Sequence, residues 1–116
     1  MITRHKGNLY AVGAYCTHFG FPLSKGVLFD DKVLCPLHTA GFSVVTGAVE
    51  KGPARDGLPK YEIIEKDGKT FVKVPEDGIK QQSKPMDMTK RDPLDSRNFV
   101  IIGGGAAGLN CAETLR

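Results

Sequence analysis

The sequence predicts a small all-β fold of antiparallel strands, followed by the start of a strand, turn and helix unit. Short apolar and β-branched runs alternate with turn residues from Ile2 to about Val74, and the chain holds 14 glycines and 7 prolines. Aromatic residues make up 8% of the chain and tryptophan is absent. These features favour short strands and tight turns over long helices. The close spacing of the runs is typical of a small antiparallel sandwich or barrel.

Three pairs of β-type runs flank short turn segments, and each pair predicts a hairpin. The paired runs are residues 2–5 and 9–12, residues 27–29 and 32–34, and residues 58–65 and 70–74. In the third pair, which turns around Gly68, we expect Tyr61, Ile63, Phe71 and Val74 to contribute to the core.

The composition changes after residue 76 and again near residue 98. Residues 77–97 are rich in charged residues and glutamine and show neither a helical nor a strand period, which predicts a linker. Its methionines leave a docking segment open as the alternative. Residues 98–102 then form an apolar β-branched run that stops at consecutive glycines, and strong helix formers follow. A buried strand, a glycine turn and a helix in this order are how a βαβ unit begins. We therefore divide the chain into residues 1–76, 77–97 and 98–116.

Charge and hydropathy exclude several classes of function. The formal net charge of +3 is small and evenly scattered, so the sequence does not predict nucleic-acid binding. No apolar run reaches the roughly 18–20 residues of a membrane-spanning helix. Three cysteines without a signal peptide argue against a secreted disulfide framework. We expect an intracellular protein, and no targeting segment separates a cytoplasmic from a mitochondrial location.

Two matched pairs of cysteine and histidine hold most of the functional information. Cys16 and His18 form C-x-H, and Cys35 and His38 form C-x2-H after an interval of sixteen residues. Structural zinc sites usually group like ligands at short spacing. Here each loop supplies one sulfur and one nitrogen, a mixture that suits a two-iron cluster with one iron on the cysteines and the other on the histidines. A zinc-stabilised protein-interaction module is the alternative.

The spacing of these pairs and the residues around them resemble the Rieske ferredoxin family. Gly20 follows the first pair, and Phe42 and Thr46-Gly47 follow the second in the manner of the family. Gly52-Pro53-Ala54 is similar to the proline loop that covers the cluster in that family. The resemblance spans about residues 2–76. It implies a small antiparallel Rieske domain with two cluster-binding loops.

The resemblance also implies one-electron transfer through a [2Fe-2S] cluster. Cys16 and Cys35 would bind the buried iron, and His18 and His38 the outer one. The neutral histidines leave the oxidised site uncharged, so its potential lies above that of four-cysteine ferredoxins. The partner would be a redox protein or a flavin domain of the same chain. A Rieske oxygenase would need two more histidines and a carboxylate for its mononuclear iron, and His5 is the one histidine that remains.

Four positions bear on the potential and on the cluster loops. High-potential members of the family carry extra cysteines at the positions that match Phe21 and Leu37, and a serine where this chain has Ala40. The resemblance therefore implies a low-potential centre with a negative midpoint potential. Thr39 is a departure, because family members usually have glycine directly after the second histidine.

The glycine-rich segment from Gly103 to Gly108 fits G-x-G-x-x-G. After a strand and before a helix, Gly103 would make the turn, Gly105 would let the backbone approach a pyrophosphate, and Gly108 would let the helix pack on the strand. A glycine-rich connection without a ligand is the alternative. The order of modules resembles the apoptosis-inducing-factor-like flavoprotein reductases. That resemblance implies that the chain is a fragment of a protein in which electrons pass between NAD(P)H, FAD and the cluster.

Overall fold

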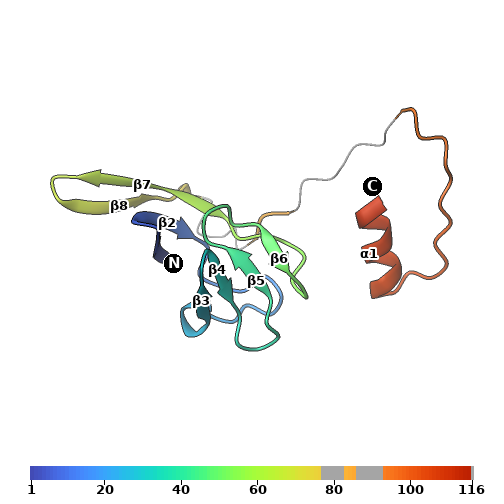
Figure 1. The fold of residues 1–116 in the computed structure, drawn as a ribbon, viewed down its shortest axis with the longest axis horizontal. Coiled ribbons are helices and arrows are strands. Elements are labelled where there is room, and N and C mark those ends of the chain that lie inside the picture. Colours follow the sequence, from blue (N-terminus) through green and yellow to red (C-terminus); the bar gives the residue numbers. More distant parts are fainter. Residues whose placement is uncertain (77–82, 86–92, 116) are drawn as a thin grey trace. The chain divides into compact units, whose positions relative to one another are not determined.

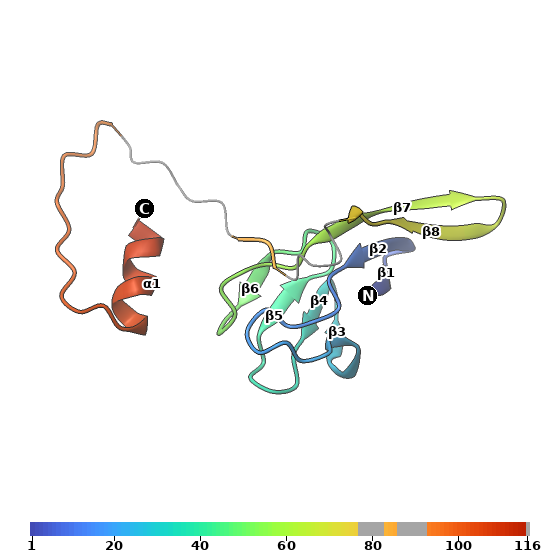
Figure 2. The same ribbon diagram turned by 180° about the vertical axis from the view of Figure 1, so that it is seen from behind.

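The computed structural model describes residues 1–76, 83–85 and 93–115. The chain forms two compact units, Met1–Met86 and Asp87–Arg116. All eight strands of the described residues belong to the first unit, and the second contains a helix (Figures 1 and 2). The prediction of a mostly β fold built from antiparallel strands is therefore confirmed.

The first sheet has the strand order β1-β2-β7-β8, and all its pairs are antiparallel. Its strands are β1 (Ile2–His5), β2 (Asn8–Val12), β7 (Lys60–Lys66) and β8 (Lys69–Lys73). Both hairpins close through two residues with positive φ, Lys6-Gly7 and Asp67-Gly68. Such turns match the right-handed twist of the strands that they join. The first and third predicted hairpins are confirmed.

The second sheet has the order β3-β4-β5-β6 and is also antiparallel throughout. Its strands are β3 (Val27–Phe29), β4 (Lys32–Leu34), β5 (Gly41–Ser43) and β6 (Val49–Lys51). The short 3-10 helix η1 (Leu23–Lys25) precedes it. The β3-β4 hairpin agrees with the sequence prediction. The hairpin runs of the sequence did not include β5 and β6, because each holds a single large apolar residue, Phe42 or Val49, and so shows no β-type run.

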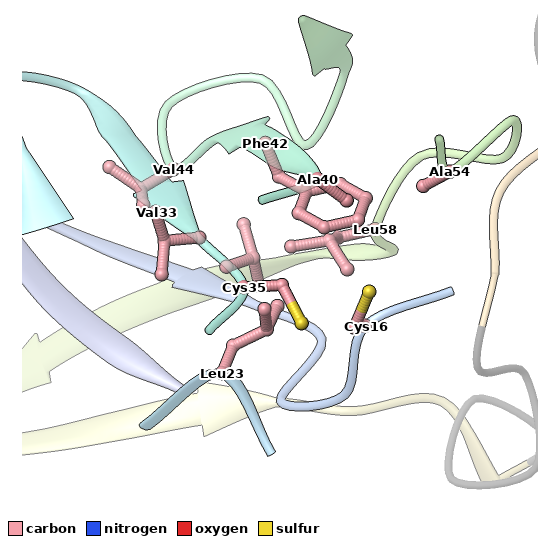
Figure 3. Close-up of a cluster of buried hydrophobic side chains, with 10 residues drawn as sticks. Cys16, Leu23, Val33, Cys35, Ala40, Phe42, Val44, Ala54 and Leu58 are labelled. Atoms are coloured by element: carbon pink, nitrogen blue, oxygen red, sulfur yellow. The ribbon is translucent and has the colours of Figure 1, made fainter. Parts of the chain in front are cut away.

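The core lies against the second sheet and the loops around it. Its fully buried large side chains are Val12, Leu23, Phe42, Val44 and Leu58, and Figure 3 shows Leu23, Phe42 and Leu58 close to the two buried cysteines.

The expected core contribution of the third hairpin is wrong for two of its four residues. Phe71 and Val74 are 51% and 41% exposed, whereas Tyr61 and Ile63 are half-buried. Strand β2 pairs with β7 only at Tyr61 and Lys60, so most of the β7-β8 hairpin pairs only with itself. A two-stranded ribbon leaves much of both faces open to solvent.

In the second unit, α1 (Ala106–Leu115) follows the glycines as predicted. The predicted strand at residues 98–102 is not formed in the described residues, and Val100 and Ile102 are 86% and 96% exposed. A strand requires a neighbour to complete its ladder of hydrogen bonds, and no described segment pairs with this run.

The predicted linker lies largely outside the described residues. Lys84, which falls within it, is described and forms an isolated antiparallel bridge with Gly57. Among the helices that the structure describes, none has the length and apolar character that a membrane crossing requires.

Candidate metal centre

The first candidate ligand loop lies between β2 and η1 and is closed by two backbone hydrogen bonds. The amide of Cys16 donates to the carbonyl oxygen of Phe21 at 2.8 Å, and the amide of Gly20 donates to the carbonyl oxygen of Cys16 at 2.7 Å. Gly20 has a φ of +69°. The loop thus turns back on its cysteine through a left-handed residue four positions later.

The second candidate loop, between β4 and β5, has the same pattern of two backbone hydrogen bonds. The amide of Cys35 donates to the carbonyl oxygen of Ala40 at 2.9 Å, and the amide of Thr39 donates to the carbonyl oxygen of Cys35 at 3.0 Å. Thr39 has a φ of +59° and stands at the position that Gly20 holds in the first loop. A β-branched residue is strained in this conformation. This explains in physical terms why glycine would suit the position.

Thr39→Gly is therefore expected to stabilise the protein by about 1 kcal/mol, since relief of left-handed strain outweighs the greater chain entropy of glycine. The reciprocal Gly20→Thr should destabilise it by a similar amount. Nothing lies within 4 Å of a Cβ added at Gly20, so a first side-chain atom meets no steric obstacle there. Unfolding in denaturant measures the free energy of unfolding of both variants and of the unmodified chain, with all proteins either loaded with metal or free of it. A lower stability of Thr39→Gly would show that contacts of the threonine exceed its strain.

The two cysteines place a pair of sulfur atoms in the interior. Cys16 and Cys35 are 3% and 2% exposed, both are free, and Figure 3 shows their sulfurs within the same cluster of buried side chains. Burial raises the pKa of the Cys16 thiol, backbone amides of His18 and Phe19 act against this, and the Cys35 thiol in hydrogen-bond contact raises it further. Burial thus favours the neutral thiol at Cys16, and a positive centre beside the two sulfurs would be needed to hold them as thiolates.

The two histidines form a second pair. The rings of His18 and His38 have centroids 5.0 Å apart and an interplanar angle of 82°. Nδ1 of His18 is buried and has no hydrogen-bond partner. A buried nitrogen without a partner is costly, and coordination of a metal is one way to satisfy it. His38 is exposed, so this pair reaches the protein surface.

Phe19, which the sequence analysis did not single out, contacts both histidine rings. Its ring centroid lies 4.3 Å from that of His18 and 5.5 Å from that of His38, although the side chain is 71% exposed. Its place directly after His18 was the one available signal in the sequence. Leu37, directly before His38, is 50% exposed. Apolar side chains therefore flank both histidines at the surface.

The segment that resembles the proline loop is connected to the first ligand loop. The hydroxyl of Thr17, between Cys16 and His18, donates to the backbone carbonyl oxygen of Asp56 at 2.6 Å. Ala54 in this segment is 6% exposed and belongs to the core. The bond spans 39 positions of sequence.

Residues 1–76, 83–85 and 93–115 contain no group of three or more Cys, His, Asp or Glu side chains arranged to hold one metal ion. The candidate ligands are instead presented as a sulfur pair and a ring pair. A structural zinc ion needs four donors around one point, whereas each iron of a Rieske cluster takes two protein ligands and completes its shell with sulfide. This arrangement fits the two-iron centre better.

The glycine segment of the second unit has a different geometry at each glycine. Gly103 has a φ of +106°, and a Cβ at Gly108 would collide with the carbonyl oxygen of Gly103 and lie 3.4 Å from Cγ2 of Ile101. The turn itself therefore accounts for these two glycines. A Cβ at Gly104 or Gly105 would meet nothing within 4 Å, so the backbone before α1 is open to an approaching group.

Three comparisons with known proteins bear on the family of this chain. The model of the Rieske [2Fe-2S] domain matches residues 1–62. Apoptosis-inducing factor 3 of Homo sapiens is 39% identical over 122 residues, which cover 100% of this chain and 20% of that protein. The chain therefore spans a fifth of the length of this relative.

Smaller relatives match the first unit. The 3-phenylpropionate/cinnamic acid dioxygenase ferredoxin subunit of Photorhabdus laumondii is 38% identical over 74 residues, which cover 63% of this chain and 70% of that protein. A chain from the complex of reduced oxygenase and oxidized ferredoxin in carbazole 1,9a-dioxygenase superposes with a TM-score of 0.59 at 33% identity, covering 62% of this chain and 74% of that one. Together with the family model, these matches show that the chain belongs to the Rieske [2Fe-2S] domain family.

Proposed function

We propose that this chain transfers single electrons through a [2Fe-2S] cluster held by Cys16, His18, Cys35 and His38. The observation that carries the proposal is the pairing of two buried sulfurs with two adjacent imidazoles, one of which has a buried nitrogen without a hydrogen-bond partner. Membership of the Rieske family and the similarity to ferredoxin subunits support it.

The burial of the four side chains suggests which of the two irons each of them would bind. Cys16 and Cys35 would hold one iron in the interior, and His18 and His38 would hold the other at the surface. When bound, the cluster supplies one-electron redox chemistry. The exposed His38 would bring its iron close to a partner protein. The iron on the buried cysteines would lie in the interior, away from water.

The charges of these ligands suit a two-iron cluster, and they would leave a single zinc ion equally neutral. Two thiolates balance the net +2 of two ferric ions and two sulfides, and the imidazoles add no charge. The buried site is then neutral, which limits the desolvation cost that a charged centre would carry. The preference for the cluster over a zinc-stabilised interaction module therefore rests on the arrangement of the donors as a sulfur pair and a ring pair.

The exposed apolar groups around the histidines support a redox protein or a flavin domain as the partner. Phe19 and Leu37 are 71% and 50% exposed beside His18 and His38. Apolar side chains at the point of electron exit suit a transient interface that excludes water. One structural neighbour comes from a complex of a ferredoxin with an oxygenase.

The second unit supports a proposal about the whole protein. The open backbone at Gly105 and the helix that follows are features of a dinucleotide-binding turn, in which the pyrophosphate lies at the helix N-terminus. We infer that residues 98–116 begin an FAD domain and that residues 77–97 connect it to the Rieske domain. The match to apoptosis-inducing factor 3 covers 100% of this chain and 20% of that protein, which supports a longer protein. The glycine turn supports an NAD(P)H-dependent flavoprotein as its identity.

Iron and acid-labile sulfide analysis together with the visible spectrum tests the electron-transfer proposal. We expect about two iron atoms and two sulfides per chain, a coloured protein, and an electron paramagnetic resonance signal on reduction. A colourless protein that contains one zinc ion per chain would contradict it and favour the interaction module.

A further inference from the structure

The segment of residues 52–59 is fixed to the rest of the Rieske domain at its C-terminal end. The amide of Leu58 donates to the carbonyl oxygen of Gly47 at 2.7 Å, and the amide of Gly13 donates to the carbonyl oxygen of Pro59 at 2.8 Å. Leu58 is fully buried in the core. Toward its N-terminal end, Ala54 belongs to the core, Arg55 is exposed and Asp56 is half-buried, and backbone groups there provide further anchors.

Two adjacent residues of the segment provide such anchors in different directions. The carbonyl oxygen of Asp56 accepts the hydroxyl of Thr17 from the first ligand loop at 2.6 Å. Gly57 exchanges two backbone hydrogen bonds with Lys84, its amide donating at 2.7 Å and its carbonyl accepting at 2.8 Å. The segment is therefore bound on one side to the ligand loop and on the other to residues 83–85, which we call the strap.

Gly57 is shaped for this contact. It is buried, and a Cβ there would lie 2.7 Å from the carbonyl oxygen of Gly47 and 3.5 Å from that of Lys84. Even the smallest side chain would push the segment away from its neighbours. The absence of a side chain lets three backbone segments lie in direct contact.

We infer that Thr17 and the strap are positioning elements that clamp the segment of residues 52–59 against the first ligand loop. Asp56 and Gly57 are consecutive, so the segment cannot lift away without breaking the bonds to Thr17 and Lys84 together. The clamp links the chain that follows the Rieske domain to the loop that carries Cys16 and His18. Its role in holding the cluster rests on the proposed function, whereas its effect on the segment does not.

Two matched pairs of variants test the clamp in the full chain. Thr17→Val removes the donor at nearly constant shape, and Thr17→Ser keeps it. Lys84→Pro removes the amide that donates to Gly57, and Lys84→Ala keeps it. A net hydrogen bond of ordinary strength changes an opening equilibrium by about five-fold.

Limited digestion with trypsin measures how often the segment of residues 52–59 opens. The cleavage rate is proportional to the population of the open state when opening and closing are fast. Cleavage after Arg55 is compared with cleavage after Lys69, which follows the exposed turn of the β7-β8 hairpin. We expect cleavage after Arg55 to rise about five-fold in Thr17→Val and in Lys84→Pro, and to stay unchanged in Thr17→Ser and Lys84→Ala. The double variant shows whether the two bonds act on the same opening.

The rate at which each variant loses its cluster to a chelator is then measured by visible absorption. We expect a faster loss in Thr17→Val and Lys84→Pro by a similar factor. If the protein binds no cluster, digestion of the cluster-free chain still measures the clamp, so the two proposals fail separately. Equal cleavage within each matched pair would overturn the inference. Should Thr17→Val misfold by circular dichroism, the Lys84 pair decides the question, because the strap lies outside the hydrophobic core.

Discussion

Cys16→Ser is expected to abolish cluster binding. Serine lacks the thiolate that binds iron, and its position is 3% exposed, so water cannot easily take the place of the missing ligand. The loss of affinity should exceed the roughly 10–100-fold that follows removal of an outer-shell partner from a metal site. Iron, sulfide and visible absorption per chain measure it directly.

Cys111→Ser is the matched control for this substitution. Cys111 is free and exposed on α1 in the second unit, away from both candidate loops in sequence. We expect its iron content and spectrum to equal those of the unmodified chain. A Cys16→Ser protein that kept the full spectrum would contradict the assignment of Cys16 as a ligand.

His38→Cys is expected to retain a cluster and lower its midpoint potential. A fourth ligand that is a thiolate instead of a neutral imidazole makes the site more negative, and an added electron is then less favourable. The shift should be on the order of 100 mV toward the range of four-cysteine ferredoxins. His38 is exposed, so the substitution leaves the hydrophobic core intact. A redox titration followed by absorption gives both midpoints.

His5→Cys serves as the control, because His5 lies on β1 outside both candidate loops. Its midpoint should match that of the unmodified chain. An unchanged or higher potential in His38→Cys would argue against histidine ligation at this position. A clearly positive midpoint of the unmodified chain would contradict the low-potential centre that Phe21, Leu37 and Ala40 indicate.

The hairpins could be predicted from local sequence. Two-residue turns such as Asp67-Gly68 need residues that tolerate positive φ, and the flanking runs pair with their nearest neighbours in the chain. Strands β5 and β6 each hold one large apolar residue, so they depend on burial and pairing that the local sequence does not reveal. The exposure of Phe71 likewise follows from the short pairing of β2 with β7, which no periodicity within the hairpin encodes.

Thr39 shows how the two kinds of information combine. In the sequence, Thr39 is a departure from the family pattern at a position whose backbone amides are expected to face the cluster sulfur. The structure places it at the left-handed position of the second loop, equivalent to Gly20 in the first. Thr39 is therefore expected to strain the backbone, and its replacement by glycine is expected to raise the free energy of unfolding by about 1 kcal/mol.

The sequence by itself determined the family and the candidate ligands, because the types and spacing of Cys16, His18, Cys35 and His38 can be read directly from the order of residues. Only the tertiary structure decided how these groups are supported. The contact of Phe19 with His38 and the bonds that join Thr17, Asp56, Gly57 and Lys84 bring distant segments together. Such contacts form where backbone groups buried by the fold must find partners, and composition and periodicity do not specify which partners those are.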